Sequence, residues 1–161
     1  TRRMIAKKFF LLLYLFLDKN YQQISIRFIG HTTEAFELDE KEFFSCQVTG
    51  GTVLSEPIKF INKIITNEYD ADSVNIYVAH ASDGENWTSD YPILKEELNI
   101  LIPRIQYFAY LEVDQRYPEY GATAFFKKEF NDPKVVSELI RKESDVYPIL
   151  RKLFTVGENH D

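Results

Sequence analysis

A buried strand that runs straight into an acidic turn constrains the fold more than any other stretch of this chain. Residues 74–81 read Val-Asn-Ile-Tyr-Val-Ala-His-Ala, a β-rich apolar run typical of a largely buried strand. Ser82-Asp83-Gly84 follows at once, and glycine tolerates the backbone angles that a sharp turn needs. The sequence therefore predicts Asp83 at the carboxyl end of a strand, beside the crevice in which open α/β sheets bind their ligands.

Strands and helices alternate along most of the chain. Alternating apolar residues predict strands, and apolar residues at intervals of three and four predict helices. The predicted strands are 24–30, 35–38, 74–80 and 105–113, and the predicted helices are 2–18, 40–45, 53–68, 91–102, 133–142 and about 144–154. Residues 114–124 are predicted to form a loop. This pattern predicts a single α/β domain over residues 1–161, a three-layer Rossmann-like fold with helices on both faces of a mostly parallel sheet.

The N-terminal stretch has the outline of a signal peptide. Two basic pairs, Arg2-Arg3 and Lys7-Lys8, precede a run of nine apolar residues at 9–17. No small-residue cleavage site follows, and the run is too short to span a bilayer. We therefore interpret residues 2–18 as a helix buried in the core of a cytoplasmic protein, not as a membrane segment. The single cysteine, Cys46, excludes an internal disulfide and a cysteine metal cage.

Charge and motif content exclude several classes of function. A formal net charge of −6 argues against general nucleic-acid binding, which normally requires a basic face. The chain also lacks the short motifs of P-loop, dinucleotide-binding, zinc-protease and serine-hydrolase sites. The predicted parallel sheet should therefore not be taken for a dinucleotide-binding domain.

Two predicted loop tips carry oxygen ligands for a hard cation. Asp83 offers a carboxylate, and Thr52 offers a hydroxyl at the end of the turn Gly50-Gly51-Thr52. Oxygen ligands of this kind suit Mg²⁺ or Mn²⁺. Each residue also has a simpler explanation, because Asp83 can bond to its own following amides and Thr52 can cap the helix that follows. The residues that would support the loop are Gly50, Gly51, Ser82, Gly84, Asn86 and Asp90, although loop polarity alone also explains them.

The remaining candidates are one tryptophan and two histidines. Trp87 is either a packed anchor of the loop or, with His31, part of a protein interface at the crevice. His31 and His80 lie at predicted strand ends near the same edge. With Asp83 they could form a zinc site or a metal-assisted hydrolase, whereas ordinary hydrogen-bonded histidines are the simpler interpretation.

Several longer stretches resemble one bacterial family. The matching stretches are KKFFLLLYLFL, HTTEAFELDEKEFFS, TGGT, NIYVAHASDGENW, YFAYLEV and DVYPILRKLF. Together they resemble the YeaH/YhbH-type proteins, which are associated with stress or sporulation. The resemblance implies a von Willebrand factor A-like domain that binds proteins and is not an enzyme, with a serine protein kinase and other stress proteins as partners.

The resemblance also implies a metal-ion-dependent adhesion site, of which this chain holds only a part. Such a site uses an Asp-x-Ser-x-Ser loop, a threonine and an aspartate, and by resemblance Thr52 and Asp83 match the last two. The Asp-x-Ser-x-Ser loop is not in this sequence, so the resemblance implies a domain truncated at its N-terminus, without its first strand. In the usual strand order that strand would lie between 24–30 and 74–80. Its absence would leave a gap of roughly 9–10 Å, which we expect direct pairing, or a strand of another chain in a homo-oligomer, to close.

Three hypotheses for the function follow. The first is a binding module with a divalent cation at the carboxyl edge of the sheet, completed by an acidic residue of a protein partner. The second is the metal-assisted hydrolase that uses Asp83 with His31 or His80. The third is a structural domain that docks on another part of the same polypeptide, and an exposed apolar face on helix 2–18 would favour it.

Overall fold

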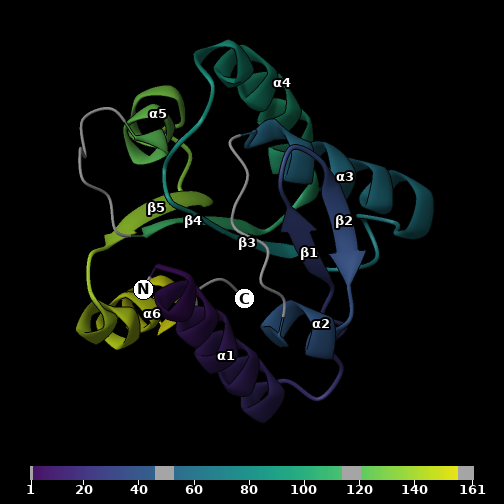
Figure 1. Cartoon of the computed structure of the whole chain (residues 1–161). Helices are drawn as coiled ribbons and strands as arrows, with labels where there is room; N and C mark the ends of the chain where they lie inside the picture. The colour runs from purple at the N-terminus through teal and green to yellow at the C-terminus, as the bar shows by residue number, and fades with distance from the viewer. Residues whose placement is uncertain (1, 46–52, 114–120, 156–161) are drawn as a thin grey trace.

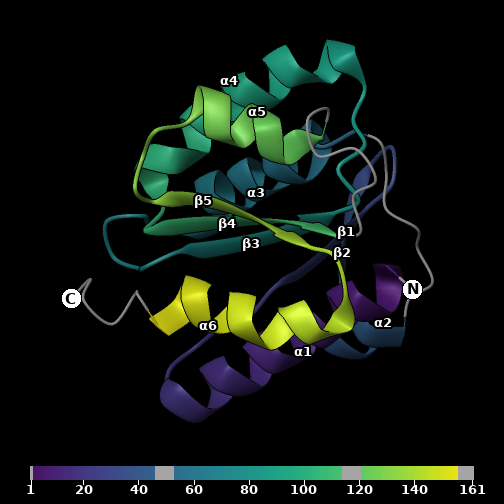
Figure 2. The same cartoon turned by 90° about the vertical axis from the view of Figure 1, so that its left-hand side faces the viewer.

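A three-stranded parallel sheet forms the centre of the protein in the computed structural model, which describes residues 2–45, 53–113 and 121–155. The strands are β3 (Tyr77–Ser82), β4 (Tyr107–Val113) and β5 (Val135–Ile140), in the order β3-β4-β5. Helices cover both faces of this sheet (Figures 1 and 2). The prediction of an α/β fold with a parallel sheet between helices is therefore confirmed.

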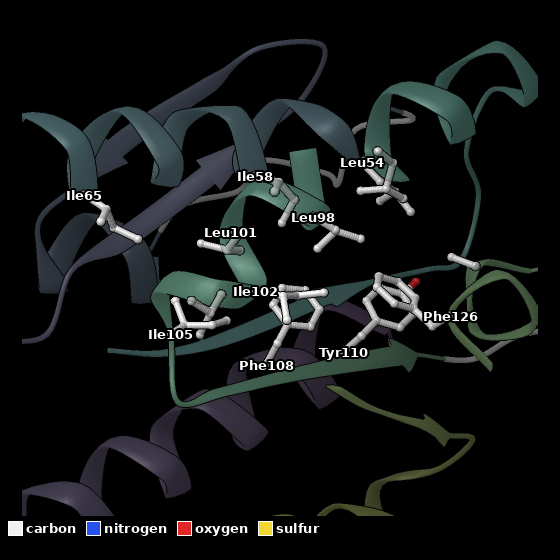
Figure 3. Close-up of a cluster of buried hydrophobic side chains, with 13 residues drawn as sticks. Leu54, Ile58, Ile65, Leu98, Leu101, Ile102, Ile105, Phe108, Tyr110 and Phe126 are labelled. Carbon is white, nitrogen blue, oxygen red and sulfur yellow. The ribbon is translucent and has the colours of Figure 1, made fainter. Parts of the chain in front are cut away.

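One face of the sheet packs against three helices. They are α3 (Ser55–Glu68), α4 (Tyr91–Leu101) and α5 (Ala122–Glu129), and short 3₁₀ turns η1 (Thr88–Asp90) and η2 (Ile102–Arg104) flank α4. Phe108 and Tyr110 of β4 point into this layer and meet Phe126 of α5, with ring centroids 5.7 and 4.6 Å apart (Figure 3). The aliphatic part of the same core comes from α3 and α4 through Ile58, Leu98 and Leu101.

The opposite face packs against α1 (Arg2–Asn20) and α6 (Val146–Thr155), which follows the 3₁₀ turn η4 (Glu143–Asp145) (Figure 2). Ala109 and Leu111 of β4 point to this side, because successive side chains of a strand alternate between faces. They pack with Phe9 and Leu13, which are the buried residues of α1. The prediction that α1 is buried is therefore only partly right, since its other side is exposed.

The hairpin of β1 (Phe28–His31) and β2 (Ala35–Leu38) forms a separate antiparallel sheet, followed by the short helix α2 (Glu40–Ser45). Arg27 holds its open end through a two-pronged ion pair with Glu37, at 2.7 Å, and a contact with Glu68. Among the described residues no backbone ladder joins β1 to β3. Direct pairing of β1 with β3 therefore does not close the gap, and its closure by a strand of another chain stays a prediction.

Two predicted elements near the C-terminus are also wrong. The predicted helix 133–142 is strand β5, whose Val135 pairs with Phe108. Asp132 does not cap a helix there, because its Oδ1 accepts the amide of Lys134 in a turn that leads into the strand. The end of the predicted loop 114–124 is instead the start of α5. Within the described segments, no helix combines the length and apolar content that crossing a membrane requires.

Candidate functional site

Asp83 lies immediately after β3, at the carboxyl edge of the parallel sheet. Its Oδ1 accepts the amide of Glu85 at 3.0 Å, so the residue does close its own turn. Its Oδ2 lies 3.8 Å from Nη1 of Arg2 on α1, and the Asp83 side chain is 29% exposed. The carboxylate therefore combines a structural role through one oxygen with a second oxygen that faces a cationic group at the surface.

A chain of buried polar groups lies beneath Asp83. Ser82 Oγ accepts the amide of Gly84 at 3.1 Å and shares a hydrogen bond of 2.5 Å with the hydroxyl of Tyr110. Tyr110 in turn donates to Glu112 Oε1 at 3.5 Å, and the amide of Thr123 donates to the same oxygen at 3.2 Å. These contacts connect the turn after β3 to the end of β4 and the first turn of α5.

Glu112 is fully buried, which is unusual for a carboxyl group. Burial raises its pKa above the ordinary value, although the hydrogen bonds from Thr123 oppose this shift. Burial also raises the pKa of Tyr110 well above its ordinary value, and the nearby Glu112 adds to that effect. Neither residue was predicted from the sequence, although a glutamate within the apolar run of β4 is a signal that identifies Glu112.

The turn after β3 requires glycine at position 84. Its φ of +86° lies in the left-handed region that other residues rarely adopt. A Cβ at this position would also overlap Oε1 of Glu112. The predicted role of Gly84 in shaping the turn is therefore supported by its backbone angle and by its packing.

The loop that follows Asp83 is fastened to the start of α3. Asn86 Oδ1 accepts the amide of Leu54 at 3.1 Å. Asp90, which is only 4% exposed, accepts the amide and the hydroxyl of Ser55 at 3.0 and 2.5 Å. Both residues therefore fasten the loop, whereas no pattern in the sequence indicated Ser55 as the partner of Asp90. Trp87 is 54% exposed, so it is not a packed anchor.

His31 of β1 and His80 of β3 face each other between the two sheets. Their Nε2 atoms are 3.2 Å apart, and both side chains are buried. Burial, together with the neighbouring His31, lowers the pKa of His80 to about 3. Burial also lowers the pKa of His31, against the opposing effect of the Asp83 carboxylate. The pair is therefore neutral and fits hydrogen-bonded histidines, which was the simpler of the two interpretations.

The described residues supply only part of a metal site. Among residues 2–45, 53–113 and 121–155, no group of three or more histidine, cysteine, aspartate or glutamate side chains is arranged to hold an ion. Asp83 and Ser82 lie together, but Ser82 is occupied by internal hydrogen bonds. Gly50, Gly51 and Thr52 lie outside the described residues. Any cation at Asp83 therefore needs ligands beyond those that the structure describes.

Comparisons with known proteins identify a family. Residues 1–156 match the family model described as "Protein of unknown function (DUF444)". The chain is 43% identical over 155 residues to a "UPF0229 protein" of Legionella pneumophila (strain Corby) and 43% identical over 156 residues to one of Stutzerimonas stutzeri (strain A1501). It is 42% identical over 151 residues to "UPF0229 protein VV2350" of Vibrio vulnificus (strain YJ016). These matches cover 93–96% of this chain but only 36–37% of each relative.

Proposed function

The chain belongs to the DUF444 family, also called UPF0229, and we propose that it supplies the Asp83 loop of a cation-dependent protein-binding module. The module would be of the von Willebrand factor A-like kind, as the resemblance to YeaH/YhbH-type proteins implies. The observation that carries this proposal is the position of Asp83. Its carboxylate stands at the carboxyl edge of a parallel sheet, where such sheets bind ligands, on a turn that Gly84 and Ser82 hold in place.

Asp83 and Thr52 would hold Mg²⁺ or Mn²⁺ together with an Asp-x-Ser-x-Ser loop from a further part of the polypeptide. An acidic residue of the protein partner would complete the set of ligands. Arg2 Nη1 lies 3.8 Å from Asp83 Oδ2, so a cation that binds this oxygen would take the place of the guanidinium. A bound cation would attract the acidic residue of the partner, and the residues of this chain would orient the Asp83 carboxylate toward the cation.

The first strand of such a domain would pair with the outer edge of β3, which has no strand partner among the described residues. Pairing there would separate His31 from His80, whose imidazoles occupy the space between β1 and β3. A strand of a second copy would have the same effect. The contact between the imidazoles therefore distinguishes a chain without that strand from one with it.

We propose proteins as the partners, with exposed Trp87 at the rim of the interface. By resemblance these partners belong to a bacterial stress or sporulation programme and include a serine protein kinase. The hydrolase built on Asp83 with His31 or His80 has less support. The two imidazoles are buried and direct their Nε2 atoms at each other, so neither is presented to a substrate.

Thermal unfolding with and without Mg²⁺ or Mn²⁺ tests the proposal, on this chain and on a form extended to the length of its relatives. A ligand at a hundredfold excess over its Kd stabilises the folded state by about 2.7 kcal/mol, and for a domain of this size that raises Tm by roughly 5–10 °C. We expect this rise in the extended form and its loss in Asp83→Ala. Asp70→Ala is the matched control, because Asp70 also accepts the amide two residues further on, at 3.1 Å, away from the site. No rise in the extended form would refute the proposal.

A further inference from the structure

Helix α1 carries an apolar surface on the side that faces away from the sheet. Phe9 and Leu13 are buried, whereas Met4, Leu11 and Leu15 are 67%, 46% and 52% exposed. Figure 2 shows α1 beneath the sheet and α6, with its far side turned outward. We call Met4, Leu11 and Leu15 the α1 seam.

The exposed positions of α1 follow a regular repeat. From Met4 to Asp18 they are separated by four, three, four and three residues, and they are Met4, Lys8, Leu11, Leu15 and Asp18. This average spacing of 3.5 residues is the repeat through which two helices pack along their length. One side of α1 therefore fits the sheet, and the other side fits a second helix.

The charges beside the seam are basic. Lys7 and Lys8 lie between Met4 and Leu11 on the helix surface, because residues three and four apart are neighbours. Lys8 already pairs with Glu143 at 2.8 Å, so Lys7 is the basic residue that an acidic neighbour on a docked helix would meet. A helix that carries acidic residues next to its apolar ones would complement this end of α1.

The small area of the α1 seam favours a helix of the same polypeptide over a helix of a separate molecule. Three side chains cover only a fraction of the roughly 800 Å² per partner that a stable interface buries. A second copy of the chain, packed in parallel along the seam, would also bring its own basic residues against Lys7 and Lys8. A segment of the same polypeptide needs less buried area than a separate molecule, since a covalent connection raises its effective concentration at the seam. The relatives have room for it, because this chain corresponds to 37% of the Legionella pneumophila protein.

We infer that the α1 seam docks an amphipathic, acidic helix that belongs to the remaining part of a polypeptide as long as the relatives. This contact is separate from the proposed cation site. It gives the domain a fixed position within the longer protein.

Paired thermal-unfolding measurements on the 161-residue chain and on the extended form test this inference. The double variant Leu11→Glu, Leu15→Glu should lower Tm of the extended form by about 5 °C or more and leave Tm of the shorter chain unchanged. Lys7→Glu should act in the same direction, again only in the extended form. Ile100→Glu on α4 is the matched control, because Ile100 is 47% exposed and receives the same charge change.

Three results of the thermal-unfolding measurements would overturn the inference. The double variant could leave the extended form unaffected, it could lower Tm equally at both lengths, or Ile100→Glu could produce the same loss. Sedimentation of the shorter chain tests whether a second copy of the chain occupies the seam instead. Association of that chain with itself that depends on Leu11 and Leu15 would show that a second copy, and not a tethered helix, occupies the seam.

Discussion

Replacing Gly84 by alanine should destabilise the protein far more than a typical loop substitution. Gly84 combines a φ of +86° with a position at which a Cβ would overlap Oε1 of Glu112. The left-handed backbone costs another residue about 1–2 kcal/mol, and overpacking of a rigid interior typically costs about 1–3 kcal/mol. We therefore expect Gly84→Ala to lower the free energy of unfolding by about 2–5 kcal/mol, equivalent to a fall in Tm of roughly 5–15 °C.

Substitutions of Glu112 separate these two contributions in a double-mutant cycle measured by urea unfolding. In a Glu112→Ala background the added Cβ has no carboxyl group to overlap, so Gly84→Ala should cost only the backbone part, about 1–2 kcal/mol. Glu112→Gln is the control, because it keeps the shape of the side chain and hence the full cost. Equal costs in all three backgrounds would refute the packing of Glu112 against Gly84.

Three further predictions address buried polar groups. Asp90→Ala should lower the free energy of unfolding by about 2–4 kcal/mol, because it leaves the amide and hydroxyl of Ser55 without their acceptor; an unchanged urea midpoint would contradict this. The neutral Tyr107 hydroxyl donates to Leu153 O, and burial raises the pKa of Tyr107 from 10.0 to about 12. Stability should therefore fall as pH rises from 10 toward 12, and Tyr107→Phe should reduce that fall in melts compared across this range. Burial raises the pKa of Glu112 above 4.5, so its folded form keeps a proton that the unfolded chain releases. Stability from this group should decrease as pH rises above 4.5, and a Tm of Glu112→Gln that follows the same pH dependence as the parent would rule this out.

The sheet could be predicted where local pattern and burial agree. β3 and β4 are apolar runs rich in β-branched and aromatic residues, and such runs are stable as strands only inside a sheet. β5 could not be predicted in the same way. Its segment 135–140 carries polar residues among valines, and Asp132-Pro133 imitates the start of a helix. Pairing with β4 decides its conformation, and no local pattern shows that pairing.

In the candidate site, too, features that depend on neighbouring residues could be predicted, and contacts between distant segments could not. The sequence was enough to place Asp83 and Gly84, because a turn after a buried strand depends on neighbouring residues. Asp90 with Ser55 and Glu112 with Thr123 are contacts between distant segments. Only the folded chain brings them together. Likewise, one side of α1 faces solvent because the sheet covers only part of the helix. The uniformly apolar sequence of α1 does not indicate how much of it the sheet can cover.

Direct binding of Mn²⁺ tests the proposed cation site most directly. The measurement is the number of bound ions per chain, determined by electron paramagnetic resonance on the extended form, on its Asp83→Ala variant and on its Asp70→Ala variant. The account predicts one Mn²⁺ per chain in the parent and in Asp70→Ala, and none in Asp83→Ala at the same free concentration. Equal binding by the parent and Asp83→Ala, or no binding by the parent, would contradict it.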